Sequence, residues 1–187
     1  SLTDADDWQF MLAGEGKATA EISENAVHIV TTNAGALDYS VQVVQAKQSL
    51  EKGYQYRLSF DAYADEARTI ITGITAPNLN YSRYMADTKV ELTTVSENYS
   101  FTFDMTSDSD ANGRVEFNMG SQGSTATIHI TNVRVEKVGQ VEDMRELNNS
   151  LPDGNFIYNS TFDRGENRLG YWTVENNCEG ADITVTN

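Results

Sequence analysis

Several side chains of this chain combine flat aromatic rings, amides and guanidinium groups, which can stack and form hydrogen bonds. Sugars present apolar C–H faces, on which aromatic rings can stack, and many hydroxyl groups, which amide and guanidinium groups can bond. Gln42 stands out because it interrupts the apolar run from Val41 to Val44. Packing within strands or loops could explain each tyrosine taken singly, and Arg68 could equally form a surface salt bridge. The candidate ligand-binding residues are Tyr39, Gln42, Arg68, Tyr81, Tyr84 and Asn118.

Catalysis has less support in the sequence. His28 and His129 both lie in strand-like patterns, and neither has a Ser or Cys nucleophile motif beside it. Spacing alone cannot assign a pair of carboxylates as general acid and base in an all-β chain. We therefore predict a chain that is not an enzyme and has no catalytic residues.

A short acidic segment, Asp108 to Gly113, matches the beginning of a calcium-binding loop. Its early oxygen ligands and its glycine follow the EF-hand pattern. The closing ligand position holds Met119 instead of glutamate, and the flanking segments are strand-like. The sequence favours a hairpin turn here over a calcium site.

The composition indicates a chain whose ligand is neutral. It has 187 residues, of which 28 are acidic and 13 basic, and a formal net charge of −15. This balance argues against nucleic acid and anionic membranes as partners, because both bind basic patches. No apolar run approaches the length of a transmembrane helix. Cys178 is the only cysteine, so an intrachain disulfide is excluded.

Two adjacent strands are the elements on which the rest of the fold is expected to build. Both 38–45 and 52–63 have strand patterns, and Leu50 to Gly53 between them is turn-like. The segment 76–84 is predicted to be a loop that exposes two tyrosines. Further strands are expected at 17–22, 26–32, 68–74, 90–92, 99–105, 114–120 and 128–135, with a bulge near Thr131-Asn132. About nine short strands without a convincing helix predict an all-β chain folded as a β-sandwich.

The end of the chain resembles its beginning. Trp172 precedes Glu179-Gly180 at the same spacing at which Trp8 precedes Glu15-Gly16. An internal repeat explains this match, although only a handful of residues agree. We predict a first module over residues 1–138, a linker over 139–154, and the opening strands of a second module over 155–187.

The order of several short motifs resembles carbohydrate-binding module family 4 and its close relatives. These motifs include Asp38-Tyr39-Ser40-Val41-Gln42, Leu50-Glu51-Lys52-Gly53-Tyr54, Phe60-Asp61-Ala62-Tyr63, Ala67-Arg68-Thr69-Ile70, Phe117-Asn118-Met119-Gly120 and Ile130-Thr131-Asn132-Val133. The resemblance covers roughly residues 8 to 138. The tail from Asn159-Ser160-Thr161-Phe162 to Trp172 looks like the opening of such a module.

The resemblance implies a β-jelly roll with a concave cleft that binds single β-glucan chains. It also implies a module secreted by a bacterium, attached to a glycoside hydrolase, and often carrying a structural calcium ion away from the cleft. By position, Tyr39 and Tyr81 match cleft aromatics with Tyr84 close by, Arg68 falls near a cleft arginine, and Asn118 replaces a common glutamine. Tyr39 stands where tryptophan is frequent, and Thr131-Asn132 is uncharged where the family is often acidic.

The first module lacks the Asn-x-x-Phe opening, because residue 1 lies only a few residues before Trp8. We therefore expect residues 155–187 to supply the missing opening strand, either within one chain or by strand swapping in a homo-oligomer.

The expected function is non-catalytic binding of soluble β-glucan, such as laminarin, mixed-linkage glucan or cello-oligosaccharide, in an aromatic and amide cleft. An adhesion or surface-layer sandwich without sugar binding is the alternative. A small jelly-roll hydrolase or lyase is a second rival, which would need a convergent pair of carboxylates or a histidine with a partner.

Overall fold

The structure is a computed structural model that describes residues 8–23 and 25–141. The chain divides into two units at Gly139–Gln140, and the first unit contains the β-sandwich. The predicted linker beyond residue 141 and the predicted second module at 155–187, with its proposed strand swapping, lie outside the described residues.

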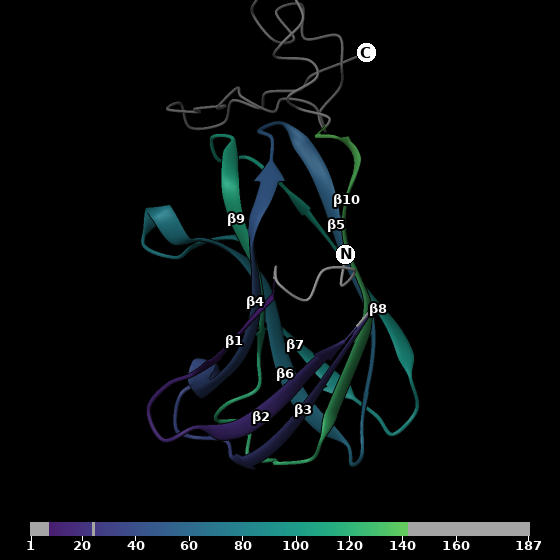
Figure 1. Cartoon of the computed structure of the whole chain (residues 1–187). Helices are drawn as coiled ribbons and strands as arrows, with labels where there is room; N and C mark the ends of the chain where they lie inside the picture. The colour runs from purple at the N-terminus through teal and green to yellow at the C-terminus, as the bar shows by residue number, and fades with distance from the viewer. Residues whose placement is uncertain (1–7, 24, 142–187) are drawn as a thin grey trace, which may run out of the picture. The chain divides into compact units, whose positions relative to one another are not determined.

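In the described part of the chain, ten strands form two antiparallel five-stranded sheets, which face each other (Figure 1). The first sheet has the order β1 (Trp8–Leu12), β4 (Val41–Leu50), β9 (Asp110–Asn118), β6 (Arg68–Ala76) and β7 (Ser82–Leu92). The second sheet has the order β2 (Lys17–Ser23), β3 (Ala26–Asn33), β10 (Ile128–Gln140), β5 (Tyr54–Ala64) and β8 (Glu97–Asp104). The predicted all-β sandwich of the jelly-roll type is confirmed.

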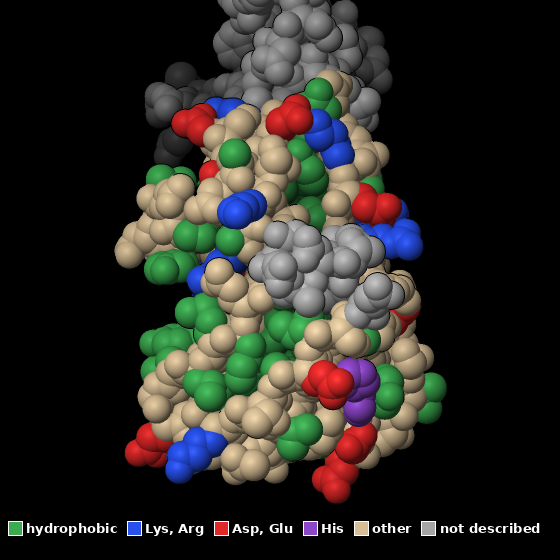
Figure 2. Space-filling model, in the orientation of Figure 1, with side chains coloured by type: hydrophobic (Ala, Val, Ile, Leu, Met, Phe, Trp, Pro, Cys, Tyr) green, Lys and Arg blue, Asp and Glu red, His purple; other side chains and the backbone are tan. Residues whose placement is uncertain are grey.

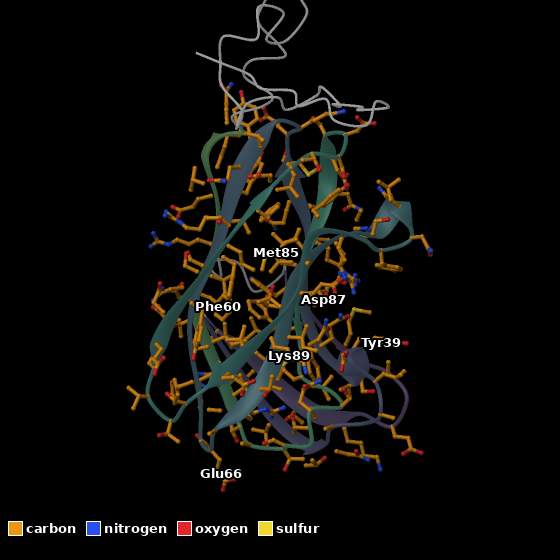
Figure 3. The ribbon with its side chains drawn as sticks, turned by 180° about the vertical axis from the view of Figure 1, so that it is seen from behind. Tyr39, Phe60, Glu66, Met85, Asp87 and Lys89 are labelled. Carbon is orange, nitrogen blue, oxygen red and sulfur yellow. The ribbon has the colours of Figure 1, made fainter. Side chains whose placement is uncertain are left out.

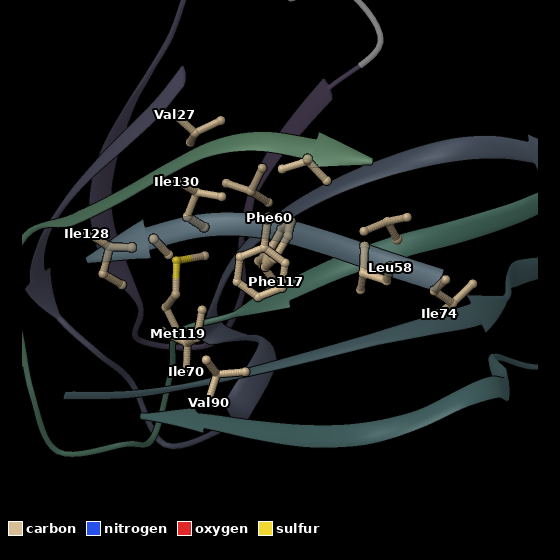
Figure 4. Close-up of a cluster of buried hydrophobic side chains, with 14 of the residues drawn as sticks. Val27, Leu58, Phe60, Ile70, Ile74, Val90, Phe117, Met119, Ile128 and Ile130 are labelled. Atoms are coloured by element: carbon tan, nitrogen blue, oxygen red, sulfur yellow. The ribbon is translucent and has the colours of Figure 1, made fainter. Parts of the chain in front are cut away.

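The core lies between the two sheets and follows from the period-two pattern of β5. Tyr56, Leu58, Phe60 and Ala62 are each at most 4% exposed, while the residues between them face outward. Phe60 meets Phe117 of the opposite sheet edge to face, with ring centroids 5.0 Å apart, in the cluster drawn in Figure 4. The alternation predicted from the sequence therefore identifies the residues that join the sheets.

Strand β6 departs from this alternation because it is covered on both faces. All but one of its residues are buried, from Arg68 at its start to Ala76 at its end. Ile70 and Ile74 face the core, and Ile71 faces the outer side of the first sheet at 6% exposure. A buried outward-facing isoleucine indicates that something lies over this part of the sheet.

Two short 3-10 helices lie where the sequence pattern predicts a strand and a loop. η2 (Asp38–Ser40) occupies the first residues of the expected strand 38–45, so that strand begins at Val41. η3 (Pro77–Leu79) lies in the expected loop 76–84, but β7 begins at Ser82, which places Tyr84 within a strand.

The acidic segment from Asp108 to Gly113 does not form the expected hairpin turn. Strand β9 already begins within it, at Asp110. Gly113 is needed for close approach, since a Cβ atom there would lie 2.9 Å from Leu50 Cδ1 and 3.0 Å from the Gln48 carbonyl oxygen. The bulge expected near Thr131-Asn132 is present, because Asn132 has a left-handed φ of 55° and burial resumes at Val133. No helix in the described part of the chain is long and apolar enough to cross a membrane.

Candidate functional site

A cleft of about 640 Å³ lies on the outer face of the first sheet. Side chains of β4, β9 and β6 form its floor, and residues of β1, β7 and the segments around η2 and η3 form its sides. The two 3-10 helices project from the same side of the molecule, at left in Figure 1. Figure 3 shows the molecule from behind, with Tyr39 pointing outward on that side.

Tyr39 and Tyr81 provide the exposed aromatic rings of the cleft, and each residue is 51% exposed. Tyr39 lies near the Asn118 end of β9, because the Gly120 amide donates to the Asp38 carbonyl oxygen at 2.8 Å. Tyr81 lies near the Arg114 end, where Arg114 Cζ is 4.8 Å from its ring centroid. Arg114 and Asn118 are separated by about 13 Å at the usual rise of a strand. The two rings therefore stand at opposite ends of the cleft along β9.

The backbone at Tyr81 is held by several contacts. Asn80 and Tyr81 have φ values of 53° and 57°, a left-handed conformation that is costly for non-glycine residues. The Tyr81 amide donates to the Ala76 carbonyl oxygen at 3.0 Å. Arg83 Nη1 donates to the Tyr81 carbonyl oxygen at 2.9 Å. Such a backbone persists only where its surroundings support it, so the point from which the Tyr81 side chain projects is fixed.

A hydrogen-bonded row of polar side chains crosses the floor of the cleft. Gln42 Nε2 of β4 donates to Asn118 Oδ1 of β9 at 2.6 Å. On the same face of β9, Glu116 accepts hydrogen bonds from Arg114 Nε at 2.8 Å and from Thr75 Oγ1 at 2.5 Å. Alternation along β9 places Arg114, Glu116 and Asn118 on one face, as the sequence pattern indicated. The floor therefore presents amide and guanidinium groups whose orientations are fixed by one another.

Most charged side chains of the cleft already have partners in the protein. Arg83 Nε pairs with Asp87 Oδ1 at 2.9 Å, and Arg114 pairs with the buried Glu116. Asp38 accepts hydrogen bonds from Ser121 Oγ and from Gln122 Nε2, the latter at 2.8 Å. Because both arginines that line the cleft already pair with carboxylates, this surface suits a neutral ligand that forms hydrogen bonds.

Four of the six residues predicted as ligand-binding are brought together in this cleft, namely Tyr39, Gln42, Tyr81 and Asn118. Sequence reasoning does not select Arg83, Asp87, Arg114 or Glu116, which also line it. The polar face of β9 is a usable signal for Arg114 and Glu116. For Arg83 and Asp87 there is no such signal, because the sequence pattern predicts this strand only from residue 90 onward.

Arg68 does not line the cleft. The residue is 4% exposed, and Nη1 and Nη2 donate to the carbonyl oxygens of Ala126 and Met119 at 2.6 Å and 2.9 Å. Burial lowers the pKa of this guanidinium from its ordinary value. Among the described residues Arg68 forms no surface salt bridge, and it instead ties the segment between β9 and β10 to β6.

Tyr84 is also outside the cleft, because its position in β7 turns the ring toward the hydrophobic core. Its hydroxyl donates to Asp110 Oδ2 at 2.9 Å. Burial, together with this bonded carboxylate, raises the pKa of Tyr84 to about 12.

In the acidic segment at the start of β9, the carboxylates of Asp108 and Asp110 bond to other groups of the protein. Asp110 also accepts from the Asn112 amide at 2.8 Å, and Asp108 pairs with Lys52 Nζ at 3.0 Å. Within residues 8–23 and 25–141, no three His, Cys, Asp or Glu side chains converge as a metal-binding group. Structural calcium stays a prediction.

Comparisons with known proteins agree with this architecture. A CBM4 domain of known structure matches with a TM-score of 0.64 and 24% identity, over 70% of this chain and 86% of that domain. The N-terminal cellulose-binding domain of Cellulomonas fimi β-1,4-glucanase C matches with a TM-score of 0.60 and 20% identity, over 75% of this chain and 95% of that domain. The second N-terminal cellulose-binding domain of the same glucanase matches with a TM-score of 0.57 and 18% identity, over 71% of this chain and 86% of that domain.

At these identities the structural matches show the shared fold alone. No curated protein matches the sequence. The model of a protein family described as "Carbohydrate binding domain" (CBM_4_9) matches residues 3–127, which is more than half of the chain. The jelly-roll sandwich and the family match lead to one conclusion: the chain belongs to this family of carbohydrate-binding domains.

Proposed function

We propose that the cleft on the first sheet binds a single chain of neutral β-glucan, with Tyr39 and Tyr81 as stacking platforms. The observation that carries this proposal is the pair of half-exposed tyrosine rings at the two ends of a floor made of amides and an arginine. Stacked aromatic rings bind apolar sugar faces, and the floor side chains bond hydroxyl groups between them. The spacing along β9 fits an oligosaccharide better than a single sugar.

The proposed role is non-catalytic. Glu116 is buried and bonded to Arg114 and Thr75, which suits a group that orients neighbours more than one that transfers protons. His28 and His129 lie on the other sheet. If the chain is attached to a glycoside hydrolase outside the cell, binding would hold that enzyme close to polysaccharide and raise its effective concentration there.

Calorimetric titration with laminarin, barley β-glucan and cello-oligosaccharides, with xylan and mannan alongside, tests the proposal. We expect saturable binding to at least one β-glucan. Tyr39→Ala and Tyr81→Ala should each weaken it by about tenfold or more, because an aromatic anchor contributes about 1.4 kcal/mol or more. Tyr63→Ala on the outer face of the second sheet is the matched control and should leave affinity unchanged. Absence of binding to every glycan, or equal loss in the Tyr63 variant, would contradict the proposal and favour an adhesion role.

Arg68 provides a second discriminating variant. Arg68→Met should lower the free energy of unfolding by about 2 kcal/mol, because one buried and one part-buried carbonyl oxygen lose their donor. Its β-glucan affinity should stay within twofold of the parent when measured on folded protein. Urea unfolding followed by circular dichroism gives the first quantity, and calorimetry gives the second. A folded Arg68→Met variant that has lost binding would instead make Arg68 part of the binding site.

A further inference from the structure

The two histidines of the chain, which we call the histidine pair, meet on the outer face of the second sheet. His28 of β3 and His129 of β10 are cross-strand partners, and their Nδ1 atoms lie 2.6 Å apart. The rings meet edge to face with centroids 4.7 Å apart. Histidine is visible at the surface in Figure 2, beside an acidic side chain. The pair is on a different sheet from the cleft, so it is independent of the proposed function.

An aspartate fixes the proton arrangement of the histidine pair. His129 Nε2 lies 3.1 Å from Asp65 Oδ1, in the turn between β5 and β6. An ionised carboxylate can only accept, so His129 Nε2 donates to Asp65, and in neutral His129 the Nδ1 atom then carries a lone pair. His28 Nδ1 then donates to that lone pair. This is the arrangement in which a carboxylate orients a metal-binding imidazole through its far nitrogen.

The surroundings hold the rings and add negative charge. The Tyr63 ring stacks on His129, with centroids 4.3 Å apart and planes 9° from parallel. Glu21 of β2 is the cross-strand partner of His28 and therefore lies on the same face of the sheet. The His129 side chain keeps 16% of its surface exposed, and that of Asp65 keeps 61%. A cation can therefore approach the histidine pair from solvent, in a region that Asp65 and Glu21 make more negative.

We propose that the histidine pair binds one divalent transition-metal ion, such as Zn²⁺, Ni²⁺ or Cu²⁺, through the two Nδ1 atoms. On binding, His28 moves its proton from Nδ1 to Nε2, so that both imidazoles stay neutral and both lone pairs face the ion. Tetrahedral ligands at about 2.0 Å from zinc lie about 3.3 Å apart, so the two rings must separate by about 0.7 Å. Water fills the remaining positions, since in the described segments no third strong ligand converges there.

The test is a titration of the untagged 187-residue chain with Zn²⁺, followed by proton NMR and by thermal unfolding. With only two histidines in the chain, their ring C–H signals report on the site directly. We expect both sets of signals to move together and saturate near one equivalent, with a rise in Tm. Cu²⁺ should bind more tightly than Zn²⁺. Lowering the pH should weaken binding, because protons compete for the imidazole nitrogens.

Variants separate this site from other sources of metal binding. His28→Gln and His129→Gln should each weaken Zn²⁺ binding at least tenfold, and Asp65→Asn should weaken it by about tenfold through loss of the orienting carboxylate. Cys178→Ser should have no effect, and excess Mg²⁺ should not compete. Binding that survives in the doubly substituted His28→Gln/His129→Gln chain, that disappears in Cys178→Ser, or that Mg²⁺ displaces would overturn the proposal. So would unmoved histidine signals at millimolar Zn²⁺.

Discussion

Replacing Arg114 with methionine should lower the free energy of unfolding by about 3 kcal/mol, because it leaves the buried carboxylate of Glu116 without its cation. The Glu116 side chain is only 3% exposed and that of Arg114 14% exposed, so the carboxylate has little contact with water to offset the lost partner. Thr75 Oγ1 still donates to Glu116, which keeps the expected loss at the lower end for a broken buried pair. Urea unfolding at 25 °C, followed by circular dichroism, measures it.

Two further variants make this prediction specific. Adding Glu116→Gln to Arg114→Met should recover most of the lost stability, since the unpaired charge is then gone. Arg57→Met is the matched control, because Arg57 pairs with Glu136 at the surface with side chains 45% and 41% exposed. Its effect should stay below about 1 kcal/mol. A loss for Arg114→Met no larger than that for Arg57→Met would show that the Glu116 carboxylate does not depend on its arginine.

The same substitution should also affect the cleft. Arg114 lies over the Tyr81 ring, and the backbone of Tyr81 is in a strained left-handed conformation. Removing the guanidinium takes away one of the contacts that hold the ring. The Arg114–Glu116 pair therefore links the stability of the sheet to the position of a proposed stacking platform.

The strands whose side chains alternate are predictable from the sequence, because a half-buried strand has its two faces in alternate residues. This is why the sequence pattern identifies β5 and the polar face of β9. The sequence pattern predicts that the strand containing β4 also includes Asp38-Tyr39-Ser40, because these residue types continue the pattern of β4. Their 3-10 turn is also held by a contact that is distant in sequence, the hydrogen bond from the Gly120 amide to the Asp38 carbonyl oxygen.

The candidate site is predictable only in part for a related reason. Tyr39, Gln42, Tyr81 and Asn118 follow from their chemistry and from the family resemblance, and they line one cleft. Arg68 has the same chemistry but points to backbone carbonyls of the segment between β9 and β10. Nothing in the local sequence distinguishes an arginine that bonds a ligand from one that bonds its own chain, because the partner lies 51 to 58 residues away.

The largest loss of stability is expected for Phe60→Ala, at about 4 kcal/mol. Phe60 is fully buried and its ring contacts Phe117 across the sandwich and Tyr99 within its own sheet, with centroids 5.0 Å and 5.5 Å away. Truncation would leave a cavity between the sheets that rigid strands cannot collapse to fill. A typical domain has only about 5 to 15 kcal/mol of stability, so this single change could remove most of it.

Graded substitutions keep the Phe60 prediction testable if the alanine variant fails to fold. Phe60→Leu retains most of the volume and should cost less than about 1.5 kcal/mol. Phe10→Ala on the edge strand β1 is the matched control, because Phe10 is only partly buried against the core and should cost clearly less than Phe60→Ala. Midpoints and slopes of urea unfolding curves would rank the three variants. If Phe10→Ala and Phe60→Ala lowered the free energy of unfolding equally, an edge residue would matter as much as the centre of the core. The Phe60–Phe117 contact would then not be the main link between the two sheets.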